Sequence, residues 1–390
     1  IRRPPRSTLF PYTTLSDLAS GNDSIRLSLL TCAPGEEIYS LFGHTAIRYE
    51  DPANGIDAVF NYGLFSFNTP NFILRFSLGE TDYQLGATDY ARFAAEYAFD
   101  GRSVWQQTLN LSKEEKAELI RLLQENYLPE NRVYRYNFFY DNCATRPRDK
   151  IEESIDGKVI YPAEPQDGSL SFRDIVHQYC KGHPWARFGI DLCIGSEADR
   201  PITQRQMMFA PFYLMDAFAG AQIVHDSVQR PLVSGKELIV DALPEEEEGG
   251  WMPTPFQCSL LLFILTAAAA IYSIRKRTGL WGVDLILFGA AGIVGCVLAF
   301  LALFSEHPAV SSNFLLLVFH PGQLLLLPYI IYCVRKGKKC WYLTLNLVVL
   351  TLFMVLFPLI PQRFDLAVVP LALCLLIRSA SNLILTSKKK

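Results

Sequence analysis

The pattern of apolar and polar residues divides the chain into two regions that meet near residue 255. Beyond that point about five long apolar runs follow one another, with short polar breaks between them. A helix needs about 20 mostly apolar residues to cross a hydrocarbon core roughly 30 Å thick. The pattern therefore predicts an all-α transmembrane domain of about five helices over residues 256–390.

Positive charge gathers at alternate breaks between these runs. The first, third and fifth runs are followed by Lys and Arg at residues 275–277, 335–339 and 388–390. The second break has no Lys or Arg, and the fourth has only Arg363. Because Lys and Arg remain on the cytoplasmic side, we expect a cytoplasmic C-terminus and a first region that lies outside the cytoplasm.

Shorter periodicities predict an α+β domain over residues 19–240. Ser112 and Glu115 match a capping box, which predicts that a helix begins there. Other segments are rich in β-branched and aromatic residues or alternate apolar and polar positions, which is typical of strands. The expected strands cover residues 25–32, 44–49, 58–62, 81–86 and 104–111, and a further helix covers residues 90–99.

Composition separates the two regions further and excludes one class of function. The first 250 residues hold 24 Lys and Arg against 36 Asp and Glu, whereas the remainder holds 12 against 3. An acidic outer domain argues against a nucleic-acid partner, which requires a basic face. The acidic segment 241–255 is interpreted as a linker, and residues 1–18 as an artefact of sequencing-adapter translation that replaces the natural start with its export signal.

The segment YNFFYDNCATRPRDK, residues 136–150, gives the sharpest local indication of chemistry. Asp141 or Asn142 can cap a helix that ends near Ser154. Cys143 would then lie in the first turn of that helix, where unpaired N–H groups favour an anion.

Such an environment lowers the pKa of a thiol, and the nearby Arg146 and Arg148 would lower it further. Cys143 is therefore a candidate nucleophile. A cysteine nucleophile needs a histidine base and a group that orients the imidazole. His44 begins one predicted strand and Asn61 lies on the next, so the two side chains can touch across a hairpin opposite the helix.

Two other groups of residues have simpler interpretations. His177, Cys180, His183 and Cys193 match no familiar zinc pattern, so a disulfide between the two cysteines or plain surface positions is favoured, and no metal or cofactor is expected. Within the apolar runs, Asp284, His320 and Gln323 are interpreted as packing between helices rather than as a transport path.

Several stretches resemble the bacterial Lnb N-terminal periplasmic domain family. The similar stretches are LLTCAPGEEIYSLFGHTAIRYED, AVFNYGLFSFNTPNF, TDYQLG, YRYNFFYDNCATRPRDKIE and DLCIGSEADRPIT. The resemblance implies a circularly permuted papain-like fold of the NlpC/P60 type, in the periplasm and anchored in the bacterial inner membrane. It assigns the nucleophile to Cys143, the base to His44 and the third polar residue to Asn61.

These observations support two hypotheses. The first is a membrane-anchored periplasmic cysteine hydrolase or acyltransferase that acts on an amide or ester of a peptidoglycan peptide or a lipid-linked substrate. The alternative is a non-catalytic binding or assembly module with a periplasmic protein partner. Transport through the helices is disfavoured because intramembrane charge is sparse.

Overall fold

A computed structural model gives the structure of the protein. The N-terminal 18 residues and most of the linker at residues 241–255 lie outside the described residues. The chain forms two compact units, of which the first comprises residues 1–175 and 201–248 and the second residues 176–200 and 249–390. The described ranges are 24–65, 70–163, 170–226, 228–242 and 252–387.

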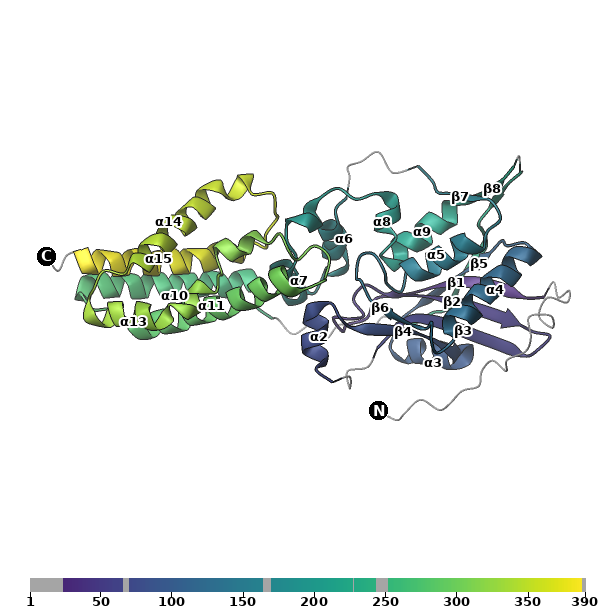
Figure 1. Ribbon diagram of the computed structural model, residues 1–390, viewed down its shortest axis with the longest axis horizontal. Coiled ribbons are helices and arrows are strands. Elements are labelled where there is room, and N and C mark those ends of the chain that lie inside the picture. Colours follow the sequence, from purple (N-terminus) through teal and green to yellow (C-terminus); the bar gives the residue numbers. More distant parts are fainter. Residues whose placement is uncertain (1–23, 66–69, 164–169, 227, 243–251, 388–390) are drawn as a thin grey trace. The chain divides into compact units, whose positions relative to one another are not determined.

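A seven-stranded antiparallel sheet forms the centre of the first unit (Figure 1). Its strand order is β10-β5-β1-β2-β3-β4-β6. The expected strands are all present, whereas β10 was not predicted because most of its side chains are exposed and no alternating pattern marks it. The strands are β1 (Arg26–Cys32), β2 (His44–Asp51), β3 (Ile56–Leu64), β4 (Asp82–Asp89), β5 (Val104–Leu109), β6 (Val133–Arg135) and β10 (Val233–Val240).

Helices cover both faces of this sheet, because successive residues of each strand point to opposite sides. Leu29, Ile47 and Phe60 pack in one cluster with residues of α4 (Lys113–Tyr127) and α5 (Thr145–Ser154). Leu30, Ala46 and Val59 pack in another, with Phe93 of α3 (Tyr90–Phe99). The capping box at Ser112 and Glu115 is confirmed. The outer domain is thus α+β, as predicted.

Smaller elements complete the first unit. A three-stranded sheet of order β7-β8-β9 joins segments that lie more than 60 residues apart in sequence. The elements are α2 (Phe72–Leu78), β7 (Lys158–Ile160), α8 (Gln204–Met207), α9 (Pro211–Gly220), β8 (Gln222–His225) and β9 (Val228–Pro231).

The second unit is all-α. Among the described residues, four helices are long and apolar enough to cross a membrane, or five if a bent pair with a 73° angle is one span. This agrees with the prediction of about five. The four are α10 (Pro255–Lys276), α11 (Trp281–Phe304), α14 (Trp341–Leu356) with its short extension, and α15 (Val368–Ser387); the bent pair ends in α13 (Leu327–Lys336).

Residues 176–200 belong to this second unit, although the sequence analysis placed them in the outer domain. They include the end of α6 (Phe172–Tyr179) and all of α7 (Pro184–Cys193). Phe188 and Leu192 of α7 pack against the apolar core of the membrane helices. Burial of these apolar side chains explains why the segment packs with the second unit and not with the outer domain.

A buried charged pair joins two of the membrane helices, near the start of α11. Asp284 on α11 accepts hydrogen bonds from Arg378 on α15 at 2.7 and 2.9 Å, and both side chains are fully buried. Asn382 donates a third bond to the same carboxylate at 3.0 Å. His320 contacts the Tyr342 hydroxyl at 3.2 Å, and Gln323 donates to a backbone carbonyl. These contacts agree with a packing role for Asp284, His320 and Gln323.

Candidate active site

The candidate site begins with a pair of residues on neighbouring strands. His44 is the first residue of β2. Asn61 lies on β3 and pairs with Ala46, the last paired position of the two strands, so Asn61 is diagonal to His44. The Nε2 atom of His44 lies 3.2 Å from Oδ1 of Asn61, so the expected contact across the hairpin is present. Gly43 precedes His44 with a φ of 75°, and a Cβ there would lie 2.6 Å from the Cys32 carbonyl oxygen, so only glycine fits the turn.

The hydrogen bonds of Asn61 determine which nitrogen of His44 carries the hydrogen. Its side-chain Nδ2 donates to the Val59 carbonyl at 3.3 Å, which orients Oδ1 toward His44. An amide oxygen only accepts, so Nε2 must donate. In the neutral imidazole Nδ1 then lacks a hydrogen and can accept a proton.

Cys143 lies in a turn just before α5 rather than in its first turn. The Asn142 Oδ1 atom accepts the backbone N–H groups of Ala144 and Thr145 at 2.8 and 2.9 Å. The same side chain donates to the carbonyls of Phe138 and Phe209, so it fixes the turn to two other points of the backbone. The expectation that free N–H groups of the helix surround the sulfur is therefore wrong, because Asn142 uses them.

The sulfur lies where β2 and β3 separate. Pairing between these strands ends at Ala46 and Asn61, and the pairing of β3 with β4 shifts register just beyond. The backbone N–H of Thr45 donates toward the sulfur, as does the N–H of Cys143 itself. Gly63 has a φ of 88°, and a Cβ placed there would contact the Cys143 Cβ at 3.5 Å. Cys143 as a whole residue is partly exposed, whereas its thiol is desolvated by burial.

The two candidate catalytic groups lie on different faces of the sheet, near the point where β2 and β3 separate. Strand alternation places His44 on the same face as Ala46, which packs under α3. Cys143 packs with the cluster under α4 and α5. We expected the imidazole of His44 to lie opposite the helix end, on the same face of the sheet as Cys143. The two residues instead lie on different faces, so any contact between them would be made at the end of the sheet.

Burial makes both groups neutral near pH 7. It raises the pKa of the Cys143 thiol to about 11, although the N–H groups of Thr45 and Cys143 act in the opposite direction. It lowers the pKa of His44 to about 4; the hydrogen bond to Asn61 opposes this shift and the charge of Arg102 adds to it. The expected lowering of the thiol pKa is therefore wrong, because desolvation disfavours the thiolate more than the nearby N–H groups favour it.

The two arginines near Cys143 are occupied by other partners. Arg146 forms two hydrogen bonds with Asp141, at 2.6 and 2.8 Å, and its guanidinium lies over the ring of Tyr134. Arg148 pairs with Asp149 and donates to a backbone carbonyl. Their charges are thus largely compensated, which is a second reason why the thiol pKa is not lowered.

These pKa values predict how Cys143 reacts with iodoacetamide. Only the thiolate reacts, so the rate should rise about tenfold per pH unit from pH 7 to pH 10 without a plateau. Peptide mass spectrometry of the alkylated full-length chain measures the rate at Cys143 separately from the other cysteines. A plateau below pH 8 would contradict the raised pKa.

Comparison with known families assigns both regions of the chain. A family model described as the Lnb N-terminal periplasmic domain matches residues 17–167, and one described as the Lnb transmembrane domain matches residues 246–390. The chain belongs to the Lnb family. No curated protein and no solved structure matches it.

The two matches indicate a membrane protein with a periplasmic N-terminal domain. His44, Asn61 and Cys143 all lie within the part matched by the Lnb N-terminal domain. Residues 168–245 lie in neither match, and they include all of α7 and β10, for which no local sequence pattern predicts an element.

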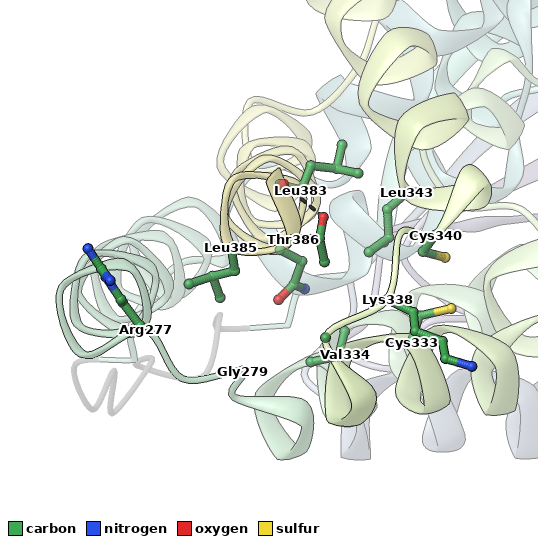
Figure 2. Close-up of a pocket in the computed structure, with 12 residues that line it drawn as sticks. Arg277, Gly279, Cys333, Val334, Lys338, Cys340, Leu343, Leu383, Leu385 and Thr386 are labelled. Atoms are coloured by element: carbon green, nitrogen blue, oxygen red, sulfur yellow. Dashed lines mark hydrogen bonds between the residues drawn. The ribbon is translucent and has the colours of Figure 1, made fainter. Parts of the chain in front are cut away.

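Other candidate sites in this Lnb-family chain have weaker chemistry. Cys180 and Cys193 are both free thiols, so they form no disulfide. His177 contacts the buried Asp191 carboxylate at 2.9 Å, and no group of metal-ligating residues occurs among the residues that the structure describes. A pocket between membrane helices, near Arg277 and Lys338, has a volume of about 30 Å³, which is about that of one water molecule (Figure 2).

Tyr134 is a residue of the candidate site that sequence reasoning missed. It lies on the short strand β6, inside an aromatic segment in which no single position stands out. Its nearness to Cys143 depends on the pairing of β6 with β4, and nothing in the local sequence indicates that pairing.

Proposed function

We propose that this Lnb-family protein is a membrane-anchored cysteine hydrolase or acyltransferase that acts on amides or esters outside the cytoplasm. The observation that carries the proposal is the His44–Asn61 pair, which leaves Nδ1 of His44 able to accept a proton. The sulfur of Cys143 lies against the backbone N–H of Thr45, the next residue along β2. The order of histidine before cysteine also fits a permuted papain-like arrangement.

In the proposed reaction both groups start neutral, so proton transfer accompanies attack. The sulfur of Cys143 bonds to the carbonyl carbon of the substrate while its proton moves to Nδ1 of His44. The backbone N–H of Cys143 stabilises the negative charge that develops on the carbonyl oxygen. His44 then returns the proton to the leaving alcohol or amine, which leaves an acyl group on the sulfur. Water or a second nucleophile releases that group.

The substrate class in this proposal is a peptidoglycan peptide or a lipid-linked compound. A membrane anchor keeps the site close to the bilayer, which favours a lipid-linked substrate. The positive charge at alternate breaks between the apolar runs supports a cytoplasmic C-terminus, with the soluble domain in the periplasm.

Detection of the acyl intermediate tests the proposal. Full-length protein in detergent is mixed with p-nitrophenyl acetate and with short-chain phospholipid, quenched in acid and digested for mass spectrometry. An acetyl or acyl group on the peptide that carries Cys143, absent in Cys143→Ala, is the expected result. If Cys143 is alkylated by iodoacetamide but never acylated, the sulfur is accessible and the enzymatic proposal fails.

A second function is favoured by two observations. The raised pKa of the Cys143 thiol and the placement of His44 on the α3 face both suit a non-catalytic binding or assembly module. Genetic complementation separates the two functions. Full rescue of a deletion strain by Cys143→Ser would support the binding module, because serine keeps the shape but is a much poorer nucleophile.

A further inference from the structure

The hydroxyl of Tyr134 is a buried polar group to which the described part of the core offers no hydrogen bond. The side chain is 7% exposed, and Oη has no hydrogen-bond partner among the residues that the structure describes. A buried hydroxyl without a partner costs stability, and phenylalanine would fill the same space without that cost. The hydroxyl therefore suits a partner that comes from outside the fold.

The same hydroxyl lies beside Cys143. A Cβ built on Gly63 would lie 4.0 Å from Oη of Tyr134 and 3.5 Å from the Cβ of Cys143, so both groups border one small region. A carbonyl oxygen of a substrate attacked by the sulfur would occupy this neighbourhood. Because position 63 lacks a side chain, no Cβ lies between the two groups.

The Tyr134 ring is held in place by its neighbours. The Arg146 guanidinium lies 3.5 Å from the ring centroid, and the ring of Tyr62 packs edge-on at 6.3 Å. Burial raises the pKa of Tyr134, and the charge of a Cys143 thiolate would raise it further, so the hydroxyl keeps its hydrogen. A fixed, protonated hydroxyl is a preorganised hydrogen-bond donor.

We infer that the Tyr134 hydroxyl donates a hydrogen bond to the oxyanion that forms when Cys143 attacks a carbonyl carbon, together with the backbone N–H of Cys143. The inference rests on the proposed function. As the S–C bond forms, the thiol proton moves to His44 and the carbonyl electron pair moves to oxygen, where Tyr134 stabilises it. The bond weakens again when the carbonyl re-forms and the leaving group departs with the proton from His44.

Two reagents separate this role from the general reactivity of the thiol. p-Nitrophenyl acetate reacts through an oxyanion, whereas iodoacetamide alkylates sulfur without forming one. In full-length protein, Tyr134→Phe should slow acetylation of Cys143 about 100-fold, as does the loss of one oxyanion donor elsewhere. Alkylation of Cys143 by iodoacetamide should be unchanged.

Tyr62→Phe is the matched control. It removes a hydroxyl from the same aromatic cluster, but that hydroxyl donates to Asn126 at 2.8 Å. The control should acetylate at the wild-type rate and melt at a lower temperature. Tyr134→Phe, which loses no hydrogen bond, should melt at or above the wild-type temperature.

The outcomes distinguish a failure of this inference from a failure of the proposed function. Equal acetylation rates in wild type and Tyr134→Phe would overturn the role of Tyr134 and leave the enzymatic proposal intact. An equal fall with both reagents would also overturn it, because the thiol itself would then have changed. If wild-type Cys143 is not acetylated at all, the proposed function fails and the inference fails with it.

Discussion

His44→Ala is expected to lower the rate of Cys143 acylation by about 10²–10⁴-fold, the usual contribution of a general base. Without the imidazole, the thiol has a pKa of about 11 and no group in place to take its proton. Release of p-nitrophenol from p-nitrophenyl acetate, with Cys143→Ala as the background, measures the effect.

The control for this variant is His225→Ala. His225 lies on β8 with a half-exposed side chain, and its ring nitrogens lie 3.4 Å from the carboxylates of Asp156 and Asp226. Its replacement should leave acylation at the wild-type rate. Equal rates in His44→Ala and wild type would show that His44 is not the base, whatever the reactivity of Cys143.

Arg378→Leu is expected to destabilise the membrane helices by about 3–5 kcal/mol, the usual cost of a buried charge left without its partner. The carboxylate of Asp284 would keep its bond to the neutral Asn382 side chain but lose its charged partner. The apparent melting temperature of the full-length protein in detergent measures the loss. The double variant Asp284→Leu/Arg378→Leu should recover most of it, because no buried charge then remains.

A partly exposed ion pair in the same unit provides the comparison. Arg363 pairs with Asp199 at 2.9 Å, and the two side chains are 51% and 10% exposed. The backbone N–H of Arg363 also donates to the Asp199 carboxylate, and that bond remains when the side chain is replaced. Arg363→Leu should therefore cost about 1 kcal/mol or less. If Arg378→Leu and Arg363→Leu have the same effect, the pair formed by Arg378 and Asp284 contributes no more than a surface contact.

Local signals predicted several features of the outer domain correctly. His44 and Asn61 lie on strands joined by one turn, and their contact follows from strand pairing over 17 residues. The helix that starts at Ser112 follows from a cap whose two hydrogen bonds lie within four residues. Such features depend on neighbours in sequence, so the sequence contains the information needed to predict them.

The surroundings of Cys143 were predicted incorrectly for a physical reason. The helix end appears favourable for an anion when only Asp141, Asn142 and the arginines are considered. In the folded chain, the Asn142 side chain accepts hydrogen bonds from the N–H groups at the helix start, and Asp141 pairs with Arg146. How far the sulfur is withdrawn from water depends on segments elsewhere in the chain, and that withdrawal sets the pKa.

By itself, the sequence determined the division into an α+β domain and apolar helices, the Lnb resemblance, the hairpin of His44 and Asn61, and the position of Cys143 beside a helix. These follow from periodicity and from contacts close in the chain. Only the tertiary structure decided the resting charge of the thiol, the nearness of Tyr134 and the pairing of Asp284 with Arg378 across 94 positions. Burial and long-range contacts arise when distant segments pack together, and no local pattern records which segments will meet.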